Sequence, residues 1–252
     1  MTLGRWLGSH RIDLLACGST NDEAARLARA GARHGTIVLA ESQHAGRGRD
    51  GRVWASPEGL GLYLSMIVRP PLSLAMVPPM TLAIGVALCD AVRSTGADAE
   101  LKWPNDVLVR GKKLAGVLVE AQSQGTRLEA VIVGIGVNLG GELPDSVAST
   151  GITLEDAAGH AIDRERFLAT LLEHLEHWID RYVASGLPAI SAAWQERMAK
   201  HVIARTDHVT GEVAGLDGDG ALLLRDERGA LHRVRSGDVE VMRDPESALP
   251  AC

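Results

Sequence analysis

Aromatic residues are scarce in this 252-residue sequence: phenylalanine, tyrosine and tryptophan together make up 3% of it. Hydrophobic residues still account for 46%, so we expect a core built mainly from alanine, valine, leucine and isoleucine. Apolar runs of the roughly 20 residues that cross a bilayer are missing. Residues 1–11 also lack the uninterrupted apolar stretch of a signal peptide. These absences predict a cytoplasmic protein without a membrane partner.

Cysteine is also rare. The three cysteines, Cys17, Cys89 and Cys252, are far apart and form no CxxC pair. Neither a structural zinc site nor a disulfide framework is indicated. A reducing compartment fits this usage.

Positive charge is in short supply, since the formal net charge is −6, and this argues against a general nucleic-acid binder. Arg47, Arg49 and Arg52 nevertheless lie within six residues of one another. The segment 46–51 matches the GxGxxG pattern, but a predicted strand follows it where a dinucleotide-binding fold needs a helix. Glycine lets the backbone approach a ligand closely, and arginine donates forked hydrogen bonds to carboxylates and phosphates. We therefore expect an anion-binding loop that orders around its ligand, with a solvated surface loop as the alternative.

Hydrophobic patterns predict an α/β domain followed by a small β-rich domain. Thr20 and Glu23 have the spacing of a capping box, with Thr20 as the N-cap, and Gly31 is placed to end that helix. After residue 200, about six short strands suggest a small β-barrel. The predicted domains are therefore 1–199 and 200–246, followed by a flexible tail at 247–252. Strands are predicted at 36–41, 60–68, 100–103, 106–110, 113–120 and 127–139, antiparallel after residue 99, and helices at 20–30, 78–93, 164–184 and 189–199.

A second polar segment, the sequence KWPND at 102–106, lies at the end of a predicted strand. Ten residues later, KKLAG begins the next strand. A hairpin joining the two strands would bring Lys102, Asp106 and Lys113 close together. Taken singly, each of these residues would more often belong to ordinary turn chemistry.

Together these segments resemble one family, the bacterial biotin–protein ligases. The resemblance extends from about residue 9 to residue 241, and Ser19-Thr20-Asn21 and Gln43 also fit it. Because 18 residues precede Ser19, the similarity is to the form without an N-terminal DNA-binding domain, and DNA is not an expected partner. The matching motifs, in the order and spacing of the family, are GRGRDGRVW, KWPNDV, GKKLAGVLVE and GIGVNL.

The resemblance implies a catalytic domain with a mixed sheet, related to class II aminoacyl-tRNA synthetases, and an SH3-like barrel after it. The implied enzyme makes biotinyl-5′-AMP from biotin and ATP with Mg²⁺. It then transfers biotin to a lysine of the biotin carboxyl carrier domain of an acetyl- or acyl-CoA carboxylase. A lipoate or octanoate ligase on the same fold is the nearest alternative, and GRGRDGR and KWPND disfavour it. A non-catalytic carrier-binding protein is a further alternative, and the oligomeric state stays open between monomer and homodimer.

The resemblance also implies roles for individual residues. Hydroxyl and amide groups can match the fixed donors and acceptors of a neutral ureido group. Positive charge is needed where a carboxylate meets the α-phosphate of ATP. Ser19 and Thr20 could instead serve only as helix caps, and Asp50 stands where some members carry another arginine. The implied biotin-binding residues are Ser19, Thr20, Gln43, Gly46, Arg47, Lys113 and Gly116. The implied nucleotide-binding residues are Arg49, Arg52, Trp54, Lys102, Asn105 and Asn138. The implied catalytic residues are Lys113, Arg47 and Arg49, with Asp106 as the magnesium ligand.

Overall fold

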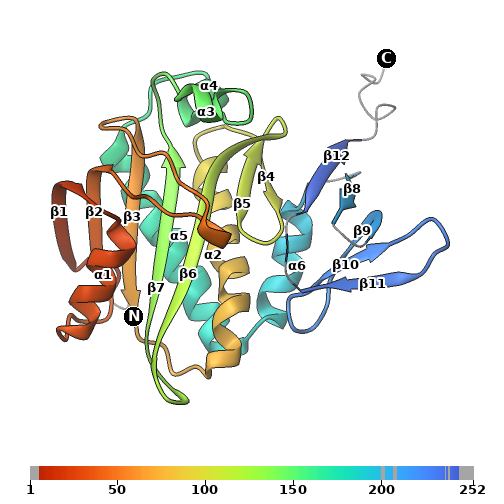
Figure 1. Cartoon of the computed structure of the whole chain (residues 1–252), viewed down its shortest axis with the longest axis horizontal. Coiled ribbons are helices and arrows are strands. Elements are labelled where there is room, and N and C mark those ends of the chain that lie inside the picture. Colours follow the sequence, from red (N-terminus) through yellow and green to blue (C-terminus); the bar gives the residue numbers. More distant parts are fainter. Residues whose placement is uncertain (1–5, 200–201, 207–208, 236, 238, 244–252) are drawn as a thin grey trace.

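Two separate β-sheets organise the chain (Figure 1). The computed structural model describes residues 6–199, 202–206, 209–235, 237 and 239–243. The larger sheet is mixed and has seven strands in the order β1-β2-β3-β7-β6-β5-β4. The outer pair β1 and β2 is parallel, and every other neighbouring pair is antiparallel. Its strands are β1 (His10–Cys17), β2 (Thr36–Gln43), β3 (Gly61–Val68), β4 (Ala99–Lys102), β5 (Asp106–Val109), β6 (Lys112–Gln124) and β7 (Arg127–Asn138).

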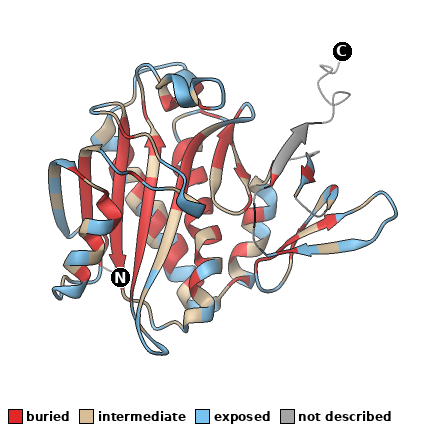
Figure 2. Cartoon of the chain, viewed as in Figure 1, coloured by how far each residue is buried: buried red, intermediate tan, exposed pale blue. Residues whose placement is uncertain are grey.

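Helices cover both faces of this sheet. On one face lie α2 (Val77–Arg93) and α5 (Arg164–Ser185), which pack against each other and enclose the main core. On the other face lies α1 (Thr20–Arg29), which buries only a small apolar cluster against β2, β3 and β7. The sheet is therefore densely covered on one side and partly open on the other (Figure 2). The remaining helical segments are η1 (Arg49–Gly51), η2 (Leu74–Met76), α3 (Asp145–Ala148), α4 (Leu154–Ala158) and α6 (Pro188–Arg197).

The alternation of side chains along a strand determines what each face carries. In β3, Leu64 and Met66 point into the core below α2 and α5, whereas Ile67 packs beneath α1. By the same alternation in β7, Val133 and Ile135 enter the main core. The face on the α1 side then carries glycines where the core face carries branched residues, which leaves room above the sheet.

Helix α2 is a core helix. The expectation that the sequence has no apolar run of membrane-spanning length is wrong for Leu74–Arg93, which is long and apolar enough by composition. However, 67% of its most apolar window is buried inside the fold. Its residues pack against β4, β6 and α5. Burial between the sheet and a second helix explains its apolar character.

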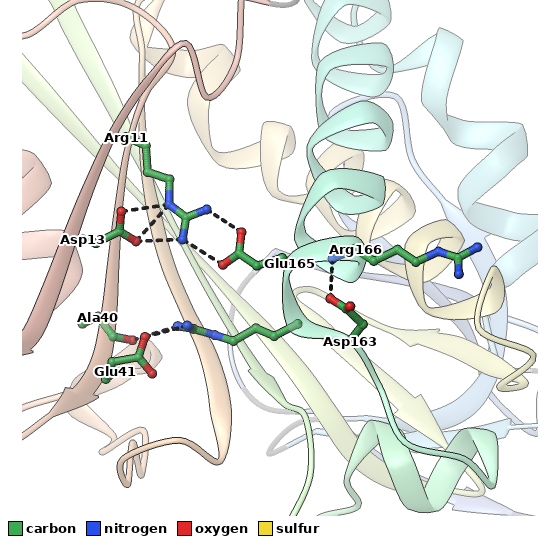
Figure 3. A network of polar contacts seen from close by, with 8 residues as sticks. Arg11, Asp13, Ala40, Glu41, Asp163, Glu165 and Arg166 are labelled. Carbon is green, nitrogen blue, oxygen red and sulfur yellow. Dashed lines mark hydrogen bonds and ion pairs between the residues drawn. The ribbon is translucent and has the colours of Figure 1, made fainter.

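Charged pairs tie the start of α5 to the outer strands of the sheet (Figure 3). Arg11 on β1 donates to both Glu165 carboxylate oxygens, at 2.6 and 2.8 Å, and also to Asp13 at 2.9 Å. Arg164 donates to Glu41 on β2 at 2.6 Å. Exposed pairs of this kind contribute only about 0.2–1 kcal/mol each, but they connect the edge of the sheet to the helix behind it.

The second sheet is small and fully antiparallel, with the order β11-β10-β9-β8-β12. It meets the larger unit at the KWPND turn, where Trp103 Nε1 donates to the carbonyl oxygen of Gly220 at 3.0 Å. Next to this contact, the backbone N–H of Ala199 donates to Leu101 at 3.1 Å. Its strands are β8 (Val202–Arg205), β9 (Thr210–Leu216), β10 (Leu222–Arg225), β11 (Leu231–Val234) and β12 (Glu240–Arg243).

The predicted architecture, an α/β unit with a mixed sheet and a small β unit after it, is confirmed. Five C-terminal strands are described where about six were predicted. Strand β1 and the short α3 and α4 were not predicted. Lys200, at the proposed domain boundary, and the predicted tail at 247–252 lie outside the described residues.

The predicted capping box at the start of α1 is wrong. Ser19 is the N-cap, Thr20 is already helical, and Ser19 makes no side-chain cap bond. The Thr20 hydroxyl instead lies 3.1 Å from Gln43 Oε1 and 2.7 Å from Ser65 Oγ. The Thr20 hydroxyl therefore contacts Gln43 and Ser65, which are distant in sequence, instead of a backbone N–H of the first helical turn. The prediction that Gly31 follows the helix in a left-handed conformation is confirmed, with φ = 88°.

Candidate active site

A pocket opens on the α1 side of the large sheet. It is lined by the start of α1, the end of β2, the loop between β2 and β3, the KWPND turn, and the middle of β6 and β7. The structure thus brings together segments that lie far apart in the sequence. The predicted site residues that line it are Ser19, Thr20, Gln43, Arg47, Arg49, Arg52, Trp54, Lys102, Asn105, Asp106, Lys113 and Gly116.

Glycines form the floor of the pocket. A Cβ atom at Gly136 would collide with the indole of Trp54, and one at Gly116 would lie 3.2 Å from the same ring. A Cβ at Gly134 would collide with the side-chain amide of Asn21. The absence of side chains at these three positions lets the indole and the amide lie directly against the sheet.

One end of the pocket is neutral and polar. The backbone N–H of Thr20 donates to Gln43 Oε1 at 2.7 Å, and Gln43 Nε2 donates to Ser56 Oγ at 2.8 Å. Gly46 does not line the pocket, but a Cβ there would lie 2.7 Å from Ser56 Oγ. The absence of a side chain at Gly46 therefore lets the loop pack against Ser56. Ser19 and Thr20, at the same end of the pocket, are almost fully buried.

The other end is cationic and is organised around Asp106. Lys113 Nζ lies 2.6 Å from Asp106 Oδ1, without hydrogen-bond alignment, and Lys102 Nζ lies 4.0 Å from Oδ2. The Asp106 side chain is only 13% exposed. The predicted proximity of Lys102, Asp106 and Lys113 is confirmed. Lys113 Nζ also lies 5.3 Å from the ring centroid of Trp54, within the range of cation–π attraction.

The loop arginine Arg47 is bound by carboxylates. Its Nη1 donates to Asp22 Oδ2 at 2.5 Å, and its Nη2 lies 3.5 Å from Glu120 Oε2. The hydrogen bond to Asp22 raises the pKa of the Arg47 guanidinium. A ligand carboxylate would therefore share the guanidinium with Asp22 and Glu120 or displace them.

Asp50 neutralises part of the same loop. It adopts a left-handed conformation with φ = 55°, and its Oδ2 lies 3.7 Å from Arg49 and 3.6 Å from Arg52. Arg49 also contacts Asn105 Oδ1 at 3.4 Å. The loop thus carries its own counter-charge at the position where some family members carry another arginine.

Asn138 lies behind the pocket. Its Nδ2 donates to the backbone carbonyls of Lys113 at 3.4 Å and Ile152 at 3.3 Å. It therefore supports the strand that carries Lys113, and its predicted contact with nucleotide stays a prediction.

Sequence analysis missed the acidic partners Asp22 and Glu120 and the buried hydroxyl of Ser65. Nothing local distinguishes them, because their partners lie 25 to 99 residues away. The glycine floor did have a signal in the sequence. In the segment VIVGIGVN, Gly134 and Gly136 are two residues apart and therefore lie on the same face of the strand. In the described part of the chain, no group of three or more His, Cys, Asp or Glu side chains could hold a metal ion.

Comparison with known proteins identifies the family. Residues 18–138 match the Biotin/lipoate A/B protein ligase family, and residues 200–242 match the Biotin protein ligase C terminal domain. The chain is 36% identical to the bifunctional ligase/repressor BirA of Bacillus subtilis, over 93% of this chain and 75% of that protein. It is 38% identical to the biotin–acetyl-CoA-carboxylase ligase of Paracoccus denitrificans, over 84% of this chain and 92% of the relative.

Structural similarity agrees with the sequence matches. The biotin protein ligase from Aquifex aeolicus in complex with biotin and ATP is similar with a TM-score of 0.78 and 30% identity. The alignment covers 94% of this chain and 100% of that one. On sequence and structure together, the chain belongs to the biotin protein ligase family.

Proposed function

We propose that this chain activates biotin with ATP to form biotinyl-5′-AMP and then transfers the biotin to a lysine of a biotin carboxyl carrier domain. The observation that carries the proposal is a single pocket in which a neutral hydroxyl and amide cluster adjoins a cluster of lysines and arginines. A neutral cyclic urea and an anionic carboxylate, the two ends of biotin, require that combination. The Aquifex relative binds biotin and ATP by its description, which supports both substrates.

In the first step, a biotin carboxylate oxygen attacks the α-phosphorus of ATP and pyrophosphate leaves. Two anionic groups must meet, so the cations of the pocket reduce the repulsion between them and stabilise the charge that develops. We assign Arg47 and Lys113 to the carboxylate and Arg49 to the phosphates. The carboxylate partners of Arg47 and Lys113 in the free chain keep these partly exposed cations ordered at the pocket.

We place the ureido group of biotin against Ser19, Thr20 and Gln43. These groups are buried, and Gln43 is held at both its oxygen and its nitrogen. Oriented groups of this kind reject analogues that lack the matching atoms. Gly46 and Gly116 contribute by leaving space.

We assign the nucleotide to the other side of Trp54, with Arg52, Lys102, Asn105 and Asn138 around it. Asp106 would hold the Mg²⁺ that accompanies ATP. Asp106 is the acidic residue of the pocket lining, and its Oδ1 is buried without a hydrogen bond. Magnesium commonly binds one or two carboxylates together with phosphate oxygens. When bound, the ion neutralises phosphate charge.

In the second step, the carrier lysine attacks the biotinyl carbonyl as a neutral amine. The amide bond forms, the bond between the carbonyl carbon and the AMP oxygen breaks, and AMP and one amine proton are released. The acceptor is the carrier domain of a biotin-dependent carboxylase in the cytoplasm, an assignment supported by the name of the Paracoccus relative. Biotinyl-AMP is a mixed anhydride that water hydrolyses. Closure of the loop at residues 46–52 over the pocket would protect biotinyl-AMP from water until the carrier binds.

ATP–pyrophosphate exchange tests the proposal. Purified protein with Mg²⁺ is assayed with biotin, with lipoate and without an acid, and exchange is expected only with biotin. Lys112→Ala is the matched control for Lys113→Ala, because Lys112 is the exposed neighbour on the same strand. Exchange with lipoate instead of biotin would reassign the chain to the lipoate ligases, and absence of exchange with either acid would refute adenylation.

A further inference from the structure

Ser65 is a polar residue in a strand that is otherwise apolar and buried. Strand β3 has the sequence GLYLSMIV, every residue of it is buried, and Ser65 is 0% exposed. Its side chain points to the α1 face, where its hydroxyl lies 2.7 Å from Thr20 Oγ1 and 2.6 Å from Asn21 Oδ1. A buried hydroxyl at the centre of a sheet requires an explanation, because an apolar residue of similar size would pack there without polar cost.

The direction of each hydrogen bond in this cluster follows from proton counting. Asn21 Nδ2 donates to Glu120 Oε2 at 2.6 Å, so the amide oxygen of Asn21 must face Ser65. That oxygen needs a donor, and Ser65 has a single hydroxyl proton. The Ser65 proton is therefore committed to Asn21. The contact between Ser65 and Thr20 at 2.7 Å is then a hydrogen bond only if Thr20 donates.

This arrangement decides what Thr20 offers to the pocket. Its hydroxyl proton points inward to Ser65, so its oxygen presents lone pairs to the pocket that it lines. The Thr20 hydroxyl also lies 3.1 Å from Gln43 Oε1, a second possible acceptor for its proton. Ser65 Oγ is the closer oxygen at 2.7 Å, and Gln43 Oε1 already accepts from the backbone N–H of Thr20, so we assign the Thr20 proton to Ser65. Ser19 lines the same pocket, and its hydroxyl does not cap the helix. An acceptor at Thr20 beside a donor at Ser19 matches an N–H group next to a carbonyl group.

We propose that Ser65 is a positioning residue for substrate recognition, which takes the Thr20 proton so that Thr20 accepts a hydrogen bond from a ureido N–H of biotin. The inference rests on the proposed function and deepens it. It makes Ser65 a determinant of specificity although it lies beneath the pocket and does not line it. Glu120 is the far end of the same chain of hydrogen bonds, because it fixes which way the Asn21 amide faces.

A double-mutant cycle tests whether Ser65 acts through Thr20. The variants are Ser65→Ala, Thr20→Val and the two combined, assayed by ATP–pyrophosphate exchange at varied biotin and varied ATP. Loss of one oriented hydrogen bond predicts a biotin KM about 3- to 10-fold higher for Ser65→Ala, with little change in kcat or in the KM for ATP. In the Thr20→Val background, the same substitution should add less than about 2-fold.

Controls separate positioning from loss of stability. Cys89→Ala is the control, because it also removes one buried polar side-chain atom, at a position on α2. In the wild-type protein, Cys89 Sγ lies 3.4 Å from the carbonyl oxygen of Ala99. Cys89→Ala should leave the biotin KM unchanged at a temperature where both proteins are folded. If Ser65→Ala does not fold, Ser65→Cys places a slightly larger and weaker donor at the same position and should also raise the biotin KM.

Each outcome has a distinct meaning. An equal rise in biotin KM with and without the Thr20 hydroxyl would overturn the inference, as would an unchanged KM in folded Ser65→Ala. Either result leaves the proposed function intact if the wild-type protein shows biotin-dependent exchange. Absence of that exchange in the wild-type protein would instead overturn the proposed function itself.

Discussion

Replacing Lys113 by alanine should separate the chemistry of the pocket from its stability. Lys113 Nζ is the nearest positive charge to Asp106, at 2.6 Å. If this ammonium also stabilises the transition state, its removal should lower kcat for exchange about 100- to 1000-fold, the effect of deleting one oriented donor. That loss corresponds to roughly 2.7–4 kcal/mol of transition-state stabilisation.

The same substitution should lower the free energy of unfolding by a smaller amount. Breaking a fully buried ion pair by removing one partner costs about 3–5 kcal/mol. Here Lys102 remains 4.0 Å from Asp106, and the Lys113 side chain is 36% exposed. We therefore expect a loss of about 1–2 kcal/mol. Adding Asp106→Asn removes the unpaired charge, so it should restore stability without restoring exchange.

Two measurements decide the matter: urea unfolding and ATP–pyrophosphate exchange with biotin, each made on the single and the double variant. Lys112→Ala reports the effect of losing a lysine outside the pocket. Folded Lys113→Ala that retains exchange within about 3-fold of the wild-type rate, or less than roughly 0.7 kcal/mol of lost stabilisation, would refute the assigned role.

Three further predictions address the loop, the glycine floor and the pH dependence of stability. Trypsin should cleave within 46–52 more slowly when biotin and MgATP are present, and equal cleavage rates would contradict closure of the loop. Gly136→Ala should lower the unfolding free energy by about 1–3 kcal/mol, because its Cβ collides with Trp54; an unchanged urea midpoint would show that the indole is held elsewhere. The hydrogen bond from Arg11 lowers the pKa of Glu165 below its ordinary value of 4.5. Its stabilisation is thus complete above pH 4.5 and is lost as the pH falls through the lowered pKa. Glu165→Gln should therefore lose less stability on acidification than the wild-type protein, and parallel pH profiles would count against the pairing.

Contiguous motifs made much of the pocket predictable. KWPND joins β4 to β5, and KKLAG begins β6, which pairs with β5. Two successive antiparallel hairpins therefore bring Lys102, Asp106 and Lys113 together, as the spacing of the motifs predicts. Most of the helices and strands were also predicted, because each has a clear apolar period or an apolar run between turns.

The interactions that cross the fold could not be predicted in the same way. Thr20 and Glu23 have the spacing of a capping box, but Gln43 and Ser65 take the Thr20 hydroxyl after the sheet has formed. Strand β1 was missed because it lies at the edge of the sheet, where mixed exposed residues such as Leu15 hide the alternation. Tertiary contacts of this kind override local propensity.

The hydrogen bond from Trp103 to Gly220 makes the stability of the large unit depend on the presence of the small one. A catalytic fragment ending at residue 199 would lose the acceptor of a buried indole N–H. It would also uncover the apolar side chains of Leu82 and Leu187, which lie beside Gly220. Such a fragment would tend to aggregate, and the turn that carries Lys102 and Asp106 would lose a support. If the two units were produced as separate fragments, this contact would give them a specific surface on which to associate. Recovery of activity on mixing the fragments would then measure their association.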